Sequence, residues 1–174
     1  MKSVVLAACV AAVALLFAPE GGASPSQQTV LPSVLLITKS SNRNQVAYAE
    51  TVDESCAPVG PSPVRPYWRM LEKGPGATEG LTSQEERALG LQRQQIAGDT
   101  VQVALRAMPD RQFGIHVARA ADGRCSSYVT TTIAGVPARL EGIFVQQKLF
   151  GSVDYVQLTG TAEGGSVVRE RVSM

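Results

Sequence analysis

The sequence predicts a mainly β protein, an antiparallel up-and-down barrel or sandwich of about eight or nine strands with one short helix. Three observations predict this fold class. Apolar and polar residues alternate over most of the chain after Asp99, and turn residues interrupt the alternation at short intervals. Only one segment carries both a helix start and a helix stop signal. Because nearly every connection is as short as a hairpin, the pattern favours the up-and-down barrel.

The N-terminal segment has the anatomy of a secretory signal peptide. A positive start is followed by an apolar run over 3–18 and by small residues over 21–24. This run is shorter than the about 20 apolar residues that a helix needs to cross a bilayer. We therefore expect a signal peptide over 1–23, a flexible leader over 24–32 and a single β domain over 33–174.

Export places the mature protein in the periplasm or outside the cell, with no integral membrane segment after signal cleavage. Cys9 ends a short box that resembles a lipidation signal, but the apolar run continues past it, so we interpret Cys9 as part of the signal. Short strands and few aromatic residues disfavour an outer-membrane barrel. A net charge of +1 with interspersed signs argues against a nucleic-acid partner.

Two cysteines remain once the signal is removed, Cys56 and Cys125. An even pair in an exported chain predicts one disulfide. Such a bond would close a loop of about 70 residues and stabilise the fold by roughly 4 kcal/mol. The alternative is a pair of unpaired buried thiols. Two distant cysteines and one histidine lack the clustered spacing of a metal site, so we expect no metal and no cofactor.

The first half of the domain begins with a predicted hairpin. Val34–Thr38 and Gln45–Ala49 are β-prone, and the Ser- and Asn-rich segment 40–44 between them favours a turn. A Pro- and Gly-rich loop over 52–62 follows. Val64–Leu71 is the third predicted strand, with the neighbouring rings of Tyr67 and Trp68 on opposite faces.

The predicted helix spans Leu81–Gly90. Thr82 as N-cap and Glu85 three residues later form a capping box, and Gly90 is a stop signal. Every later segment is predicted to be a strand of a meander. These strands are expected at Val101–Leu105, Phe113–Val117, Tyr128–Ile133, Ala138–Gln147, Val153–Thr159 and Ser166–Val172.

His116 is the only histidine, so any histidine-based catalysis would use it. In a strand it points away from Phe113, Ile115 and Val117. If those three residues face the core, His116 lies on the surface. If the faces are exchanged, it lies in a barrel interior, where a ligand site would need it.

Polar residues that packing does not require gather at Asn42, Asn44, Arg69 and Glu72. The amides offer donors and acceptors, and Arg69 offers a fork for a carboxylate or phosphate. Trp68 beside them could serve as a ligand platform. Our hypothesis is that these residues line one concave site. In the alternative, the asparagines satisfy backbone groups and Arg69 pairs with Glu72 or another carboxylate.

A motif lies in the middle of the chain, Cys56-x-Pro58-x-Gly60-x-x-Pro63-Val64-x-x-Tyr67-Trp68-Arg69-Met70-Leu71-Glu72. Further matching residues are Lys39, Ser40, Asn42, Asn44, Val46, Tyr48, Gly74, Pro75, Leu81, Glu85, Ala88, Gly90 and the segment 153–160. Over residues 33–172 the chain resembles a bacterial domain family of unknown function, domain-of-unknown-function family 4833. Members of the family have a Tyr before the Gly that ends the helix, where this chain has Leu89. The resemblance implies a single small domain with no established activity.

The function most consistent with the sequence is non-catalytic binding of an unknown small molecule or of an envelope protein. The ligand-binding residues expected are Asn42, Asn44, Trp68, Arg69, Glu72 and His116. The alternative is an extracytoplasmic hydrolase of unknown substrate that uses Arg69, Glu72, His116 or the loop carrying Asn42 and Asn44. The sequence contains none of the familiar nucleophile, metalloprotease or phosphate-loop motifs.

Overall fold

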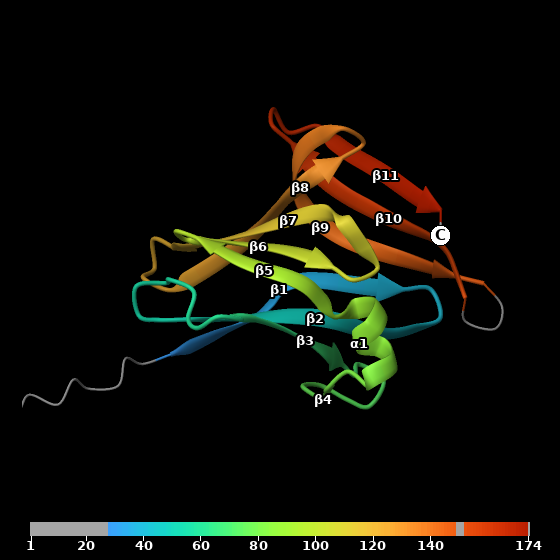
Figure 1. The fold of residues 1–174 in the computed structure, drawn as a ribbon, viewed down its shortest axis with the longest axis horizontal. Coiled ribbons are helices and arrows are strands. Elements are labelled where there is room, and N and C mark those ends of the chain that lie inside the picture. Colours follow the sequence, from blue (N-terminus) through green and yellow to red (C-terminus); the bar gives the residue numbers. More distant parts are fainter. Residues whose placement is uncertain (1–27, 149–151, 174) are drawn as a thin grey trace, which may run out of the picture.

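A computed structural model describes residues 28–148 and 152–173 of this protein (Figure 1). The predicted signal peptide and residues 24–27 of the predicted leader lie outside the described residues. The chain is mainly β, as predicted. The one helix among these residues is α1 (Ser83–Leu89). The strands are β1 (Thr29–Lys39), β2 (Asn42–Val52), β3 (Val64–Arg69), β4 (Thr78–Glu79), β5 (Leu91–Ala97), β6 (Thr100–Leu105), β7 (Met108–Arg119), β8 (Cys125–Ile133), β9 (Val136–Gln147), β10 (Val153–Ala162) and β11 (Val167–Ser173).

The strands form one large, curved, mostly antiparallel sheet that does not close into a barrel (Figure 1). The predicted up-and-down barrel is therefore wrong. The order is β4-β3-β2-β1-β9-β8-β7-β6-β5, and β10 and β11 continue from the other edge of β9. The reason is the length of β9. Its first half pairs with β8, at Val129↔Leu140, and its second half pairs in parallel with β1, at Ile37↔Ile143, so the meander branches instead of closing.

Two of the observed strands were not predicted. β4 has only two residues. β5 is mostly exposed and carries the polar run Gln92–Gln95, so it lacks the alternation by which strands are recognised. The sheet consequently has 11 strands rather than eight or nine.

Helix α1 begins where its capping box predicts. The Thr82 hydroxyl accepts from the Glu85 amide, and the Glu85 carboxylate accepts from the Thr82 amide at 2.8 Å. These bonds satisfy amides that the first turn of a helix leaves unpaired. The helix ends before Gly90, as predicted. Its last carbonyl, on Leu89, accepts a 2.6 Å bond from the buried Tyr48 hydroxyl, which ties α1 to β2.

The β1–β2 hairpin has a shorter turn than predicted. Only Ser40 and Ser41 form the turn, and β2 begins at Asn42. Asn44 is therefore a strand residue, with its side chain nearly buried.

The core lies on the inward face of the curved sheet. Phe113, Ile115 and Val117 are at most 2% exposed, so the predicted core face of β7 is confirmed. A second, smaller cluster gathers around Val52 and Cys56. Cys56 and Cys125 form the predicted disulfide, with Cα atoms 5.5 Å apart. The bond indicates an oxidising compartment.

A buried carboxyl group lies between the two clusters. On the inward face of β2, Glu50 follows Tyr48 of the main cluster and precedes Val52 of the smaller one. Neither Glu50 oxygen has a hydrogen-bond partner in the described part of the chain. Burial raises the pKa of Glu50 from 4.5 to about 7.

Strands β3 and β5 approach each other without pairing, and we call this junction the first seam. The Gln94 side chain spans it. Its carbonyl accepts from the Val64 amide at 3.0 Å, and its NH₂ group donates to the Val64 carbonyl at 2.9 Å. The Gln94 side chain thereby makes with Val64 the two backbone hydrogen bonds that a neighbouring strand would otherwise make.

Candidate functional site

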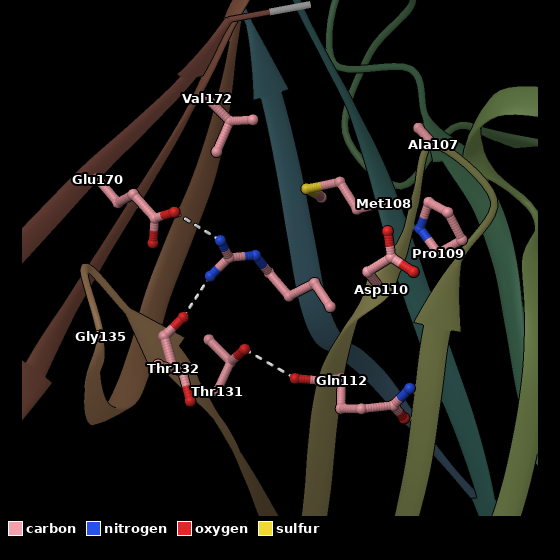
Figure 2. Close-up of a pocket in the computed structure, with 11 residues that line it drawn as sticks. Ala107, Met108, Pro109, Asp110, Gln112, Thr131, Thr132, Gly135, Glu170 and Val172 are labelled. Carbon is pink, nitrogen blue, oxygen red and sulfur yellow. Dashed lines mark hydrogen bonds and ion pairs between the residues drawn. The ribbon is translucent and has the colours of Figure 1, made fainter.

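A cleft of about 550 Å³ opens between the β6–β7 hairpin and strand β11 (Figure 2). We call it the β7–β11 cleft. Its lining comes from residues 107–112, from Thr131 and Thr132 of β8, from Gly135, and from Glu170 and Val172 of β11. Its volume lies within the range of small-molecule sites, about 300–1,000 Å³.

A charged pair crosses one wall of this cleft. Arg111 Nη2 contacts Glu170 Oε1 at 2.6 Å, and Arg111 Nη1 donates to the Thr132 carbonyl. The second carboxylate oxygen of Glu170 accepts from the Ala134 amide at 2.7 Å. Both charged side chains are only about a fifth exposed. The pair joins the β7–β8 side of the sheet to β11, and we call this junction the second seam.

The surroundings of Glu170 keep it ionised. Burial alone would raise the pKa of this carboxyl, but the Ala134 amide and the Arg111 guanidinium outweigh burial and lower it. Both members of the second seam are therefore charged at neutral pH. Their bonds hold the Arg111 fork in one place, so the wall of the cleft is formed before any ligand arrives.

The remaining lining of the cleft is of two kinds. Met108 and Val172 are partly buried and pack against the core, so they provide an apolar wall. The exposed Asp110 carboxylate, on the hairpin side, forms no ion pair with other described residues. Figure 2 shows Asp110 and Glu170 on opposite sides of the cleft. The arrangement suits a ligand with an apolar body and a hydrogen-bonding group.

The predicted polar residues of the first hairpin mostly bond to one another. Asn42 Oδ1 accepts from the Asn44 amide at 3.1 Å. Asn44 Oδ1 accepts from the Glu72 amide at 3.1 Å, and the Glu72 carboxylate accepts from the Arg43 amide at 3.3 Å. These contacts tie β2 to the segment after β3. They match the alternative in which the asparagines satisfy backbone groups.

A smaller cavity of about 180 Å³, which we call the Trp68 pocket, lies beside this network. Asn44 and Trp68 both line it. Asn42 and Arg69 do not, so the four residues do not border a common pocket. Arg69 forms no ion pair with Glu72. Ligand binding by these residues stays a prediction. The full lining is Lys39, Asn44, Trp68, Met70, Glu79, Gly80, Thr82 and Glu85.

His116 lies on the outer face of β7, because the residues on either side of it in the strand face the core. The alternative that placed it in a barrel interior is therefore wrong. Its Nδ1 is 3.0 Å from the Thr100 hydroxyl and its Nε2 is 2.9 Å from the Thr130 hydroxyl. Its ring stacks on Tyr128 at 4.7 Å. His116 lines neither cavity, and a hydrolase stays a prediction.

Sequence reasoning missed the lining of the β7–β11 cleft. The sequence pattern predicted no site role for Glu170, Arg111 or Met108. One signal was present. Glu170 falls between Val168 and Val172 on the face of β11 that packs toward the core, and a charge in that pattern needs a partner.

Two arrangements are absent from the described residues. Residues 28–148 and 152–173 contain no group of three His, Cys, Asp or Glu side chains arranged to hold a metal ion. The same residues include no helix of the length and apolarity required to span a membrane.

The fold and its cavities define a disulfide-linked β-sheet protein with two candidate ligand sites. The chain belongs to the family described as Domain of unknown function (DUF4833), whose family model matches residues 35–171. The predicted resemblance is thus confirmed, and the match includes the disulfide and most of both cavity linings. No curated protein and no solved structure matches the chain.

Proposed function

We propose that this protein is an exported binding protein that holds a small, partly apolar molecule in the β7–β11 cleft. The observation that carries the proposal is the two-sided chemistry of that cleft. The apolar wall of Met108 and Val172 faces polar groups that are already fixed by the second seam. Preformed cavities of this size and character are the usual form of small-molecule sites.

The charge of the cleft indicates which ligands fit. The Arg111 charge is balanced by Glu170, which leaves the Asp110 carboxylate as a further negative group. A ligand with a cationic or hydrogen-bond-donating group directed at Asp110 would therefore bind better than an anion. Its apolar part would cover Met108 and Val172, where removal from water favours binding.

The first experiment uses the dye N-phenyl-1-naphthylamine, a neutral apolar molecule with one N–H donor. Its fluorescence should rise saturably as it enters the cleft. Ala107→Phe places a ring in the cleft and should abolish the rise. Val167→Phe, at an exposed position of β11 that does not line the cleft, is the matched control and should leave it unchanged. Equal dye binding by both variants would contradict the proposal.

A second experiment tests the role of Asp110. 1-Naphthylmethylamine is cationic at neutral pH, and Asp110→Asn should weaken its binding about fivefold, which corresponds to ~1 kcal/mol. The same variant should leave binding of the neutral dye unchanged. A loss of equal size for both probes would show that Asp110 does not select the charge.

Export is the second part of the proposal. The disulfide and the apolar N-terminal run of the sequence both support it. Mass spectrometry of the protein from its host should show a chain that starts at or near Ser24. A soluble form that still begins at Met1 would contradict export.

A further inference from the structure

Lys39, the last residue of β1, presents a fixed ammonium group at the Trp68 pocket. Its Nζ lies over the Trp68 ring, 4.4 Å from the centroid, and both residues line the pocket. A cation held over an indole face is attracted by the negative electrostatic potential of that face. None of the ion pairs among the described residues involves Lys39.

The other polar groups of this pocket are already occupied. The Asn44 side chain bonds to Glu72 through both its oxygen and its nitrogen. Glu79 pairs with Lys73.

Glu85 accepts from the amide and the hydroxyl of Thr82 in the capping box. Burial raises the pKa of Glu85, but the Thr82 bonds, the Trp68 side chain and the nearby Lys39 charge outweigh burial and lower it. Lys39 therefore attracts Glu85 without forming an ion pair with it. Among the charged groups of the lining, the Lys39 ammonium is therefore the one whose N–H donors remain available to a bound ligand.

From this arrangement we propose that the Trp68 pocket binds a small monocarboxylate and that Lys39 is the residue that holds it. The ammonium donates to the carboxylate, and the short carbon chain lies against Met70 and the indole edge. A volume of about 180 Å³ admits only a few heavy atoms. The carboxylates of Glu79 and Glu85 on the same lining repel a dianion more strongly than a monoanion. This site is separate from the β7–β11 cleft and does not depend on the function proposed for it.

The chain supplies its own probe for this site, because Trp68 is its only tryptophan. The mature protein is titrated with sodium propionate, with chloride replaced so that ionic strength stays constant. We expect a saturable change in tryptophan fluorescence. Propionamide, which has the same shape without the charge, and inorganic phosphate should each give no saturable change. A purely linear response to propionate would reflect collisional quenching and would overturn the proposal.

Variants assign the effect to Lys39. Lys39→Met keeps the side-chain stem but removes the charge, and it should abolish the saturable response. Lys39→Arg should keep it. Lys148→Met removes an exposed lysine that pairs with Asp154 and should behave as the wild type. Circular dichroism checks that each variant is folded. Saturation that persists in Lys39→Met, or is lost in Lys148→Met, would overturn the assignment.

A carboxylate ligand could be a free acid or the C-terminus of a peptide. A further titration, with a peptide, distinguishes these two sources. The size of the pocket favours the free acid. A tetrapeptide with a free C-terminus should therefore give a weaker response than propionate. A stronger response from that peptide, lost when its C-terminus is amidated, would overturn the free-acid source.

Discussion

The two seams of the sheet join strands that do not pair, yet they do so with different chemistry. At the first seam, the neutral amide of Gln94 both donates to and accepts from the Val64 backbone. At the second seam, the charged side chains of Arg111 and Glu170 meet each other and reach backbone groups of β8 and of the turn after it. Val64 at the first seam is 1% exposed, whereas the charged pair at the second borders a cleft.

The comparison concerns how the side chains at each seam affect the space beside it, which is filled at the first seam and open at the second. A Gln side chain that copies the backbone pattern brings β5 close enough to β3 for the core to be covered. The partly exposed Arg–Glu pair joins β11 to the β7–β8 side of the sheet and lines an open space beside the β6–β7 hairpin. This space is the β7–β11 cleft. Hydrogen exchange at one backbone amide can follow each seam separately. The Val64 amide follows the first seam, and the Ala134 amide follows the second.

The largest effect is expected from the disulfide, which ties the β2–β3 loop to β8. Replacing Cys56 and Cys125 by Ser should lower the free energy of unfolding by roughly 4 kcal/mol, because the unfolded chain regains the freedom of a long loop. Urea denaturation measures this change. Unchanged stability after both substitutions would contradict a structural role for the bond.

The next largest effect concerns Glu50, which pairs in register with Val64 behind the first seam. The unfolded chain ionises this carboxyl near pH 4.5, whereas the folded chain keeps the proton until about pH 7. Stability should therefore fall as pH rises from 4.5 to 7 and then level off. Glu50→Gln should remove this dependence and be more stable than the wild type at pH 8, by up to about 3 kcal/mol. Parallel stability profiles of the two proteins from pH 4 to 8 would contradict this prediction.

Breaking the first seam should have an intermediate effect. Gln94→Leu leaves the buried Val64 amide and carbonyl without partners, which should cost about 2 kcal/mol. Hydrogen exchange of the Val64 amide should become faster, while that of Ala134 stays the same. Gln95→Leu, an exposed neighbour on β5, is the control. Equal acceleration at both amides would mean that the seams are not independent.

Breaking the second seam should have the smallest effect, because its ions are partly hydrated. Arg111→Met should cost about 1 kcal/mol at pH 7 and speed exchange at Ala134 but not at Val64. The pKa of Glu170 is lowered by folding, so the pair stabilises the protein above pH 4.5. This stability is lost as pH falls below that value, and the gap between variant and wild type should close. Arg169→Met, exposed on the same strand as Glu170, is the control. A gap that persists at pH 3 would show that lost packing, not charge, explains the effect.

Much of the strand content was predictable because alternation directly reports which face of a strand is buried. Phe113, Ile115 and Val117 show this in β7. The capping box at Thr82 is equally local. The branched sheet was not predictable, because the parallel pairing of β1 with β9 joins Ile37 to Ile143, 106 positions apart. Nothing in the local pattern of either strand specifies that partner.

The residues of the candidate sites also include some that the sequence predicted and some that it did not. Asn44 and Trp68 were predicted and do line one pocket, since both come from paired neighbours β2 and β3. Lys39 was named only among the residues that match the family, and no role was predicted for Arg111. Arg111 meets Glu170 across 59 positions of sequence, and only the branching of the sheet at β9 brings their strands together.

The parallel contact between β1 and β9 also sets an order of events during folding. The β1–β2 and β7–β8 hairpins need only short loops to close and should form early. The β1–β9 contact must wait until β9 is available and a very long loop has closed, which makes folding slow. The earliest strand to be synthesised therefore stays without one of its neighbours until most of the chain exists. Removing either end of the domain would leave an edge of the central sheet unpaired, so we expect no stable half-domain.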